Sequence, residues 1–108
     1  MAGGDGDDIY VVDSTSDTVT ENSSAGTDTI QASVAWTLGD NVENLTLTGT
    51  GDINATGNSL DNTLTGNDGA NTLDGDSGDD TMAGGDGNDI YVVAVSYTHL
   101  TLPTTLPV

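Results

Sequence analysis

The sequence predicts an all-β protein, a parallel β-roll or β-solenoid made of short strands joined by glycine-rich turns. A nine-residue pattern repeats four times in one register between Gly57 and Val92, which is the strongest observation. Period-two alternation of apolar residues recurs before that array, and no window shows helical periodicity with caps. One inward-facing apolar residue per nine cannot bury a core alone, so the units are expected to stack.

The four units read GNSLDNTLT, GNDGANTLD, GDSGDDTMA and GGDGNDIYV, and are called units one to four below. Gly stands first in each unit, and Asp or Asn stands sixth. Three units carry a second glycine at position four. We expect the glycines at positions one and four to adopt positive φ in a tight turn. Positions seven to nine are expected to form a very short strand whose eighth side chain points inward; these are Leu64, Leu73, Met82 and Tyr91.

Unit four, residues 84–92, resembles the glycine- and aspartate-rich nonapeptide of RTX (repeats-in-toxin) proteins. The resemblance implies a right-handed parallel β-roll in which two nonapeptides make one coil and Ca²⁺ is held between successive turns. The family's glycine at position two occurs only as Gly85. Asn58, Asn67 and Asp76 stand there in the other units, so the array is a degenerate version of the pattern.

With two units per coil, residues 18 apart stack, so Asn62 is expected over Asp80 and Asn71 over Asp89. Each pair, with carbonyls of the glycine turns, offers oxygen ligands that suit Ca²⁺ better than Mg²⁺ or Zn²⁺. Each pair has one carboxylate and one amide, so we expect weak sites, near or beyond the ~10⁻⁴–10⁻³ M range of extracellular modules. The alternative is that these are polar turns without metal. The glycines expected to shape the turns and lend carbonyls are Gly66, Gly69, Gly75, Gly78, Gly84, Gly85 and Gly87.

The charge of the chain limits its partners. It has 18 acidic residues and no Lys or Arg, for a formal net charge of −18. Nothing basic is available to bind nucleic acid or to insert beside anionic lipid. The self-repulsion opposes a compact state unless cations neutralise it, which predicts folding conditional on Ca²⁺. The absence of cysteine excludes a disulfide framework and a thiolate metal site.

The first half of the chain carries a less regular form of the same pattern. Alternation in Val34, Trp36 and Leu38, and again in Leu45 and Leu47, predicts short strands. We therefore interpret residues 1–56 as irregular, wider coils that begin with one nonapeptide, and residues 57–93 as the tandem array. Asp8 and Asp28 are candidates for a further metal site, although their separation of 20 residues instead of 18 argues against it.

Both ends of the chain indicate a fragment. Residues 1–12 recur as residues 82–93 with one difference, so the chain holds one superrepeat and the start of the next. Residues 94–108 contain no Gly and no acid, but hold the sole His and both Pro. Codons for this tail resemble a transposase-based sequencing adapter. We therefore predict that residues 94–108 are non-native and disordered, and exclude them from the fold.

Catalysis finds no support, because His99 lies in that tail and the turn carboxylates are accounted for by metal binding. The resemblance implies a Ca²⁺-binding segment of a large secreted or cell-surface bacterial protein, exported through a type I system and folding outside the cell. The expected partners are calcium ions and neighbouring repeats. One alternative is an adhesion module whose Thr- and Asn-rich strands, such as 45–48 and 71–73, bind a glycan, a surface or ice. Another is the non-catalytic tail of a secreted protease or lipase.

Overall fold

The computed structural model describes residues 5–21 and 26–92, and within these ranges the regular structure is all β. No helix in this part of the chain is long and apolar enough to cross a membrane. The predicted adapter tail, residues 94–108, lies outside the described residues. The strands are β1 (Ile9–Val12), β2 (Thr29–Ala32), β3 (Trp36–Thr37), β4 (Asn44–Leu47), β5 (Asn54–Thr56), β6 (Thr63–Thr65), β7 (Thr72–Asp74), β8 (Thr81–Ala83) and β9 (Ile90–Val92).

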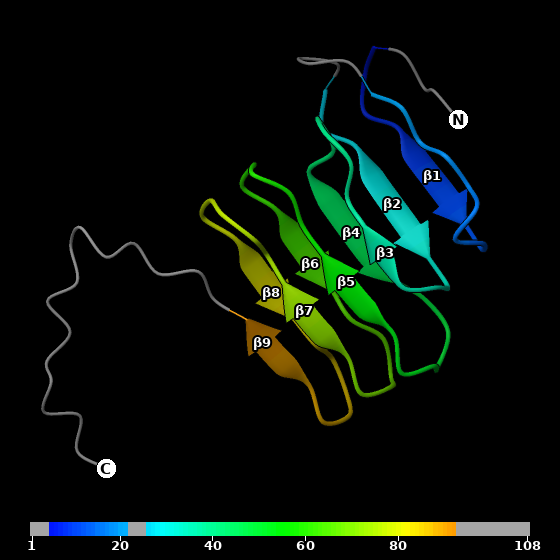
Figure 1. Cartoon of the computed structure of the whole chain (residues 1–108), viewed down its shortest axis with the longest axis vertical. Helices are drawn as coiled ribbons and strands as arrows, with labels where there is room; N and C mark the ends of the chain where they lie inside the picture. The colour runs from blue at the N-terminus through cyan, green and yellow to red at the C-terminus, as the bar shows by residue number, and fades with distance from the viewer. Residues whose placement is uncertain (1–4, 22–25, 93–108) are drawn as a thin grey trace, which may run out of the picture.

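The strands form two parallel sheets. One has five strands in the order β1-β2-β4-β6-β8, and the other has four in the order β3-β5-β7-β9. Figure 1 shows the coils following one another along the molecule, with successive strands alternating between the sheets from β2 onward. The predicted parallel β-solenoid is therefore confirmed.

The length of each coil follows from the strand register. Thr63 pairs with Thr81 and Thr72 pairs with Ile90, so the tandem units form coils in which residues 18 apart are neighbours. The earlier coils differ in length. Asp8 and Asp28, which are neighbours in successive coils, are 20 residues apart, Asp28 and Glu43 are 15 apart, and Glu43 and Asn62 are 19 apart. The connections between strands absorb these differences in length, while the strand pairing stays parallel and in register.

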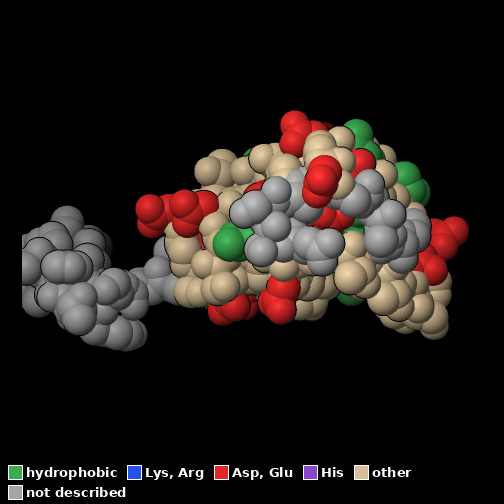
Figure 2. Space-filling view, turned by 90° about the horizontal axis from the view of Figure 1, so that it is seen from above, with side chains coloured by type: hydrophobic (Ala, Val, Ile, Leu, Met, Phe, Trp, Pro, Cys, Tyr) green, Lys and Arg blue, Asp and Glu red, His purple; other side chains and the backbone are tan. Residues whose placement is uncertain are grey.

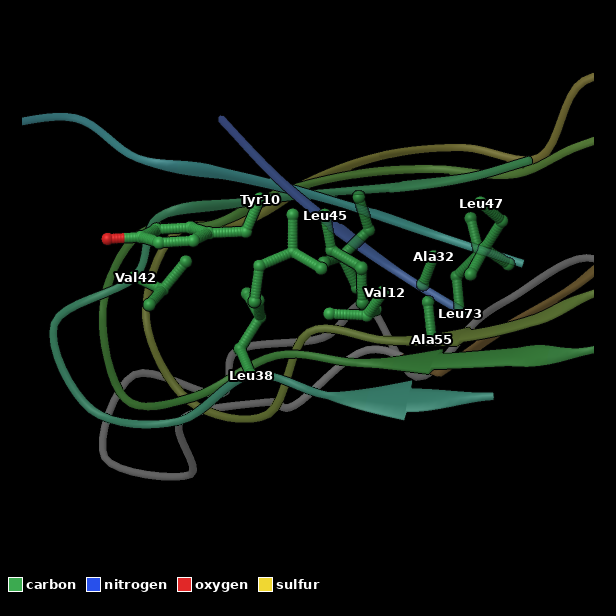
Figure 3. Packing of buried hydrophobic residues seen from close by; sticks show 11 residues of the cluster. Tyr10, Val12, Ala32, Leu38, Val42, Leu45, Leu47, Ala55 and Leu73 are labelled. Atoms are coloured by element: carbon green, nitrogen blue, oxygen red, sulfur yellow. The ribbon is translucent and has the colours of Figure 1, made fainter. Parts of the chain in front are cut away.

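The inward-facing side chains form one continuous core between the sheets (Figure 3). Strands β1, β2 and β4 alternate exposed or half-buried residues with buried ones, as the period of two requires. Leu64 and Leu73, both at position eight, are fully buried, and Met82 is partly buried against the core. The expectation for Tyr91 was wrong: it is 47% exposed, because β9 is the last strand in the order of its sheet and no further strand among the described residues covers it.

Candidate metal centre

The sixth position of each unit stacks as the sequence predicts. The Asn62 N–H donates to Asp80 Oδ1 at 2.7 Å, and the Asn71 N–H donates to Asp89 Oδ1 at 2.9 Å. Each aspartate thus accepts a hydrogen bond from the backbone N–H of the asparagine one coil earlier. Both Asp80 and Asp89 are half-buried, whereas Asn62 and Asn71 are almost fully buried.

The glycines at position one are needed for close approach and not for positive φ, which corrects the expectation. A Cβ on Gly75 would overlap Asp80 Oδ2, and a Cβ on Gly84 would overlap Asp89 Oδ2. The carboxylate of position six therefore lies against the glycine that opens its own unit. At position four the expected positive φ occurs in Gly78, at 100°, and in Gly87, at 96°, but the expectation is wrong for Gly69.

Position two divides the four turns into two kinds. In unit three Asp76 has a φ of 62°, and in unit four Gly85 has a φ of 77°; both residues are exposed. In units one and two the same position holds Asn58 and Asn67, which are buried. Neither asparagine is among the positive-φ residues of the described chain.

The two buried position-two asparagines are bonded to the coil beneath them. Asn58 Nδ2 donates to the carbonyl oxygens of Gly39 and Val42 at 2.7 and 2.8 Å. Asn58 Oδ1 in turn accepts the N–H of Leu60 at 2.9 Å and Nδ2 of Asn62 at 3.0 Å.

Unit two has the same geometry. Asn67 Nδ2 donates to the carbonyls of Thr48 and Gly51, each at 3.1 Å, and Asn67 Oδ1 accepts the Gly69 N–H at 2.8 Å. An amide group thus bridges two carbonyl oxygens of the preceding coil in each of these turns.

The predicted amide ligands are engaged in this network. Asn62 Oδ1 accepts the Asn58 N–H and Asn71 Oδ1 accepts the Asn67 N–H, both at 2.8 Å. Their Nδ2 atoms donate to carbonyls of the coil beneath, at 3.1 Å to Glu43 and 2.8 Å to Ile53. Whether either oxygen also binds an ion stays a prediction.

The carbonyl oxygens of the glycines that open units three and four face the first glycines of units one and two. The Gly75 carbonyl oxygen lies 2.8 Å from where a Cβ on Gly57 would be, and the Gly84 carbonyl oxygen faces Gly66 in the same way. With the carboxylates of Asp80 and Asp89, these are hard oxygen donors of the kind that Ca²⁺ prefers. The donor set at these turns therefore fits Ca²⁺.

The other predicted turn glycines also lie against the preceding coil. A Cβ on Gly78 would lie 2.6 Å from the Leu60 carbonyl oxygen, and one on Gly87 would lie 2.6 Å from that of Gly69. Gly69 itself faces the Gly51 carbonyl, so this contact between coils recurs at position four.

Figure 2 shows acidic side chains at several places around the face that it draws. The chain has no Lys or Arg to neutralise these carboxylates.

A second group of carboxylates lies at the first coil. Asp8, which precedes β1, lies beside Asp28, which precedes β2, and the Asp8 N–H donates to Asp28 Oδ1 at 2.9 Å. The separation of 20 residues therefore does not keep the two apart. Glu21 from the β1–β2 connection joins them, with one carboxylate oxygen of each residue within 4.8 Å of the others.

Sequence reasoning missed Glu21, because it belongs to no repeat unit and no spacing indicates where its side chain lies. Asp28 is fully buried among these groups. Burial raises the pKa of the Asp28 carboxyl, the Asp8 N–H bond lowers it, and the carboxyls of Glu21 and Glu43 raise it again, so that the net shift is upward.

Comparison with known proteins identifies the repeat. The family model of the RTX calcium-binding nonapeptide repeat matches four copies, over residues 1–19 and 56–91, which is just over half of the chain. The chain is 45% identical over 64 residues to the endo-1,3-1,4-beta-glycanase ExsH of Rhizobium meliloti (strain 1021). That alignment covers 59% of this chain but only 14% of the glycanase. No solved structure matches. The chain belongs to the RTX calcium-binding nonapeptide repeat family, whose repeats are structural, non-catalytic elements that bind Ca²⁺.

Proposed function

We propose that this chain is a Ca²⁺-conditional folding segment of a larger bacterial protein that is exported through a type I system and works outside the cell or on its surface. The observation that carries the proposal is the array of carboxylate-bearing glycine turns in a chain of net charge −18 with no Lys or Arg. At low cytosolic Ca²⁺ this repulsion opposes the compact state. Outside the cell, Ca²⁺ that binds only the folded form contributes its binding energy to folding.

The residue at position two decides which turns take an ion. In units one and two, the amides of Asn58 and Asn67 bridge carbonyls of the coil beneath, so these turns close without metal. In units three and four, Asp76 is exposed and Gly85 has no side chain, so no amide fills the corresponding space. Ca²⁺ takes that place beside Asp80 and Asp89, with the turn carbonyls completing an oxygen shell.

The test is a Ca²⁺ titration of the full chain followed by far-UV circular dichroism, with Mg²⁺ as the control ion. A cooperative rise of β signal between micromolar and millimolar Ca²⁺ is expected. Asp80→Asn and Asp89→Asn should move the midpoint to higher Ca²⁺, whereas Asp40→Asn, an exposed site outside the repeats, should not. A full β signal in chelator that Ca²⁺ leaves unchanged would refute the proposal.

A second candidate function is adhesion through the outer face of the five-stranded sheet. Strand pairing places polar side chains in one row across β2, β4, β6 and β8, and a second row runs beside it. The first row is Thr29, Asn44, Thr63 and Thr81, and the second contains Gln31, Thr46 and Thr65. Neighbouring strands lie about 4.8 Å apart, so this is a regular ladder of hydroxyl and amide groups.

Glycan-array and ice-affinity measurements test this second candidate. Thr46→Lys and Thr63→Lys change the ladder. The sequence also predicted residues 71–73 as part of the adhesive face, but β7 lies in the other sheet, so Thr72→Lys is the matched control. If binding occurs, the first two substitutions should abolish it and the control should retain it. Binding that survives both ladder substitutions would exclude this face.

The similarity to a glycanase supports a catalytic domain elsewhere in the parent protein, acting on a polysaccharide. In that arrangement this chain is the non-catalytic, Ca²⁺-folded part. Recovery of the flanking coding sequence and assay of the whole protein on mixed-linkage β-glucan would test this. A parent without glycan-hydrolysing activity would refute it.

A further inference from the structure

Three carboxylates converge at the first coil, outside the tandem array. Asp8 directly precedes β1, Glu21 lies in the β1–β2 connection and Asp28 directly precedes β2; one oxygen of each lies within 4.8 Å of the others. Asp28 is 0% exposed and Glu21 is 8% exposed, so two of the three side chains are more than nine-tenths buried.

Each of these carboxylates has an oxygen atom that no hydrogen bond satisfies. Within the described residues, Asp8 Oδ2, Glu21 Oε2 and Asp28 Oδ2 are buried without a partner. The remaining oxygens of the two most buried groups are held in place: Asp28 Oδ1 accepts the Asp8 N–H at 2.9 Å, and Glu21 Oε1 accepts the Tyr10 hydroxyl. In Asp28 and Glu21, the hydrogen bond to one carboxylate oxygen therefore fixes the position of the other, unpartnered oxygen.

Tyr10 explains how Glu21 is held at the edge of the core. The ring of Tyr10 is buried among the core side chains, and its hydroxyl points away from them (Figure 3). The hydroxyl bond to Glu21 fixes the connecting segment at this point. The ring anchors the phenol, so Glu21 is held beside Asp8 and Asp28.

The chain contains no Lys or Arg to neutralise the cluster, and no histidine occurs among residues 5–21 and 26–92. Burying an ionised carboxylate without a countercharge is costly, and three adjacent carboxylates also repel one another. Buried charges in proteins are paired or coordinate metals. A cation among the three free oxygens would satisfy all of them together.

We propose that Asp8, Glu21 and Asp28 form a cation site for Ca²⁺ that joins the first two coils and fixes the β1–β2 connection to them. Carboxylate oxygens from three separate segments suit a hard cation of flexible geometry, with water filling the remaining positions. The nonapeptide pattern does not contain this site, because Glu21 and Asp28 lie outside the residues that the family model matches. This site would hold a further Ca²⁺ ion, bound by side chains of a wider coil, in addition to the ions proposed for the nonapeptide turns.

The test is the number of Ca²⁺ ions bound per full chain, measured by isothermal titration calorimetry. Glu21→Gln and Asp28→Asn keep the oxygen that accepts the existing hydrogen bond but remove the negative charge. Each variant should bind one Ca²⁺ fewer than the wild-type chain, and the double variant should lose no more than either single one. The matched control Asp40→Asn, exposed and outside the cluster, should leave the number unchanged.

Thermal unfolding gives a second measurement, whose sign a purely structural role would not produce. In chelator, with sucrose added so that the chain folds without Ca²⁺, Glu21→Gln and Asp28→Asn should raise the Tm, because each removes an uncompensated buried charge. In saturating Ca²⁺ the same variants should show a smaller Ca²⁺-induced rise in Tm than the wild-type chain. If both variants bind as many ions as Asp40→Asn and keep the full Ca²⁺-induced rise, the cluster holds protons and the proposal is wrong.

The same experiment separates this site from the nonapeptide turns. Asp80→Asn should remove ions of the tandem array and leave the effect of Asp28→Asn intact, because the two substitutions act on different coils. Loss of an ion in Asp80→Asn but not in Asp28→Asn would overturn only the cluster. Absence of Ca²⁺ binding in the wild-type chain would overturn both proposals.

Discussion

Replacing Asn58 by Ala tests whether a side-chain amide closes the unit-one turn. The substitution removes four hydrogen bonds: two from Nδ2 to the carbonyls of Gly39 and Val42, and two to Oδ1 from Leu60 N–H and Asn62 Nδ2. Each such bond contributes about 0.5–1.5 kcal/mol net, and the bonds share one group, so their contributions are not strictly additive. We expect a loss of about 2–4 kcal/mol in the free energy of unfolding.

The measurement is urea denaturation of the full chain in saturating Ca²⁺, followed by the fluorescence of Trp36, which packs partly buried against the core and is the sole tryptophan. Asn54→Ala is the matched control, because Asn54 is exposed on β5. The number of bound Ca²⁺ ions should stay the same in Asn58→Ala. A stability loss no larger than that of the control would refute the reasoning, and so would the loss of a bound ion.

Three further predictions concern the core, the turns and the first coil. Leu64→Ala should lower the free energy of unfolding by about 2–5 kcal/mol, as for a fully buried leucine. Met82→Ala should lower it clearly less, because Met82 is only partly buried. Equal losses in urea denaturation would contradict this prediction. Gly75→Ala should raise the Ca²⁺ concentration at the folding midpoint, because the new Cβ overlaps Asp80 Oδ2. The control Gly39→Ala should leave the midpoint unchanged, because its Cβ meets nothing within 4 Å. Equal midpoints for the two variants by circular dichroism would contradict the turn geometry. In chelator with sucrose, which favours the folded chain without Ca²⁺, burial raises the pKa of Asp28 in the folded state, so stability is highest below the unfolded pKa and falls as pH rises through the folded one. The stability gained by Asp28→Asn should therefore grow as pH rises from about 4, and a gain that is constant with pH would exclude this cause.

The repeat by itself determined the architecture. A nine-residue period with one apolar position predicts stacked parallel coils, because such units can bury their apolar residues only against copies of themselves. The same period predicted that Asn62 meets Asp80 and that Leu64 is buried, and the structure confirms both. The reason is that in a solenoid, neighbours in space are separated by a fixed distance in sequence.

The tertiary structure alone decided what happens where that period fails. Glu21 lies in a connection with no repeat, so only the folded structure shows that its carboxylate, bonded to the Tyr10 hydroxyl, reaches Asp8 and Asp28. The period also provided no reason to distinguish Asn58 from Asp76, which both stand at position two. The Asn58 amide bridges two carbonyls of the coil beneath, whereas the Asp76 side chain is exposed. Both outcomes depend on which atoms of the preceding coil lie within reach of a side chain, and the spacing of residues along the chain does not encode that distance.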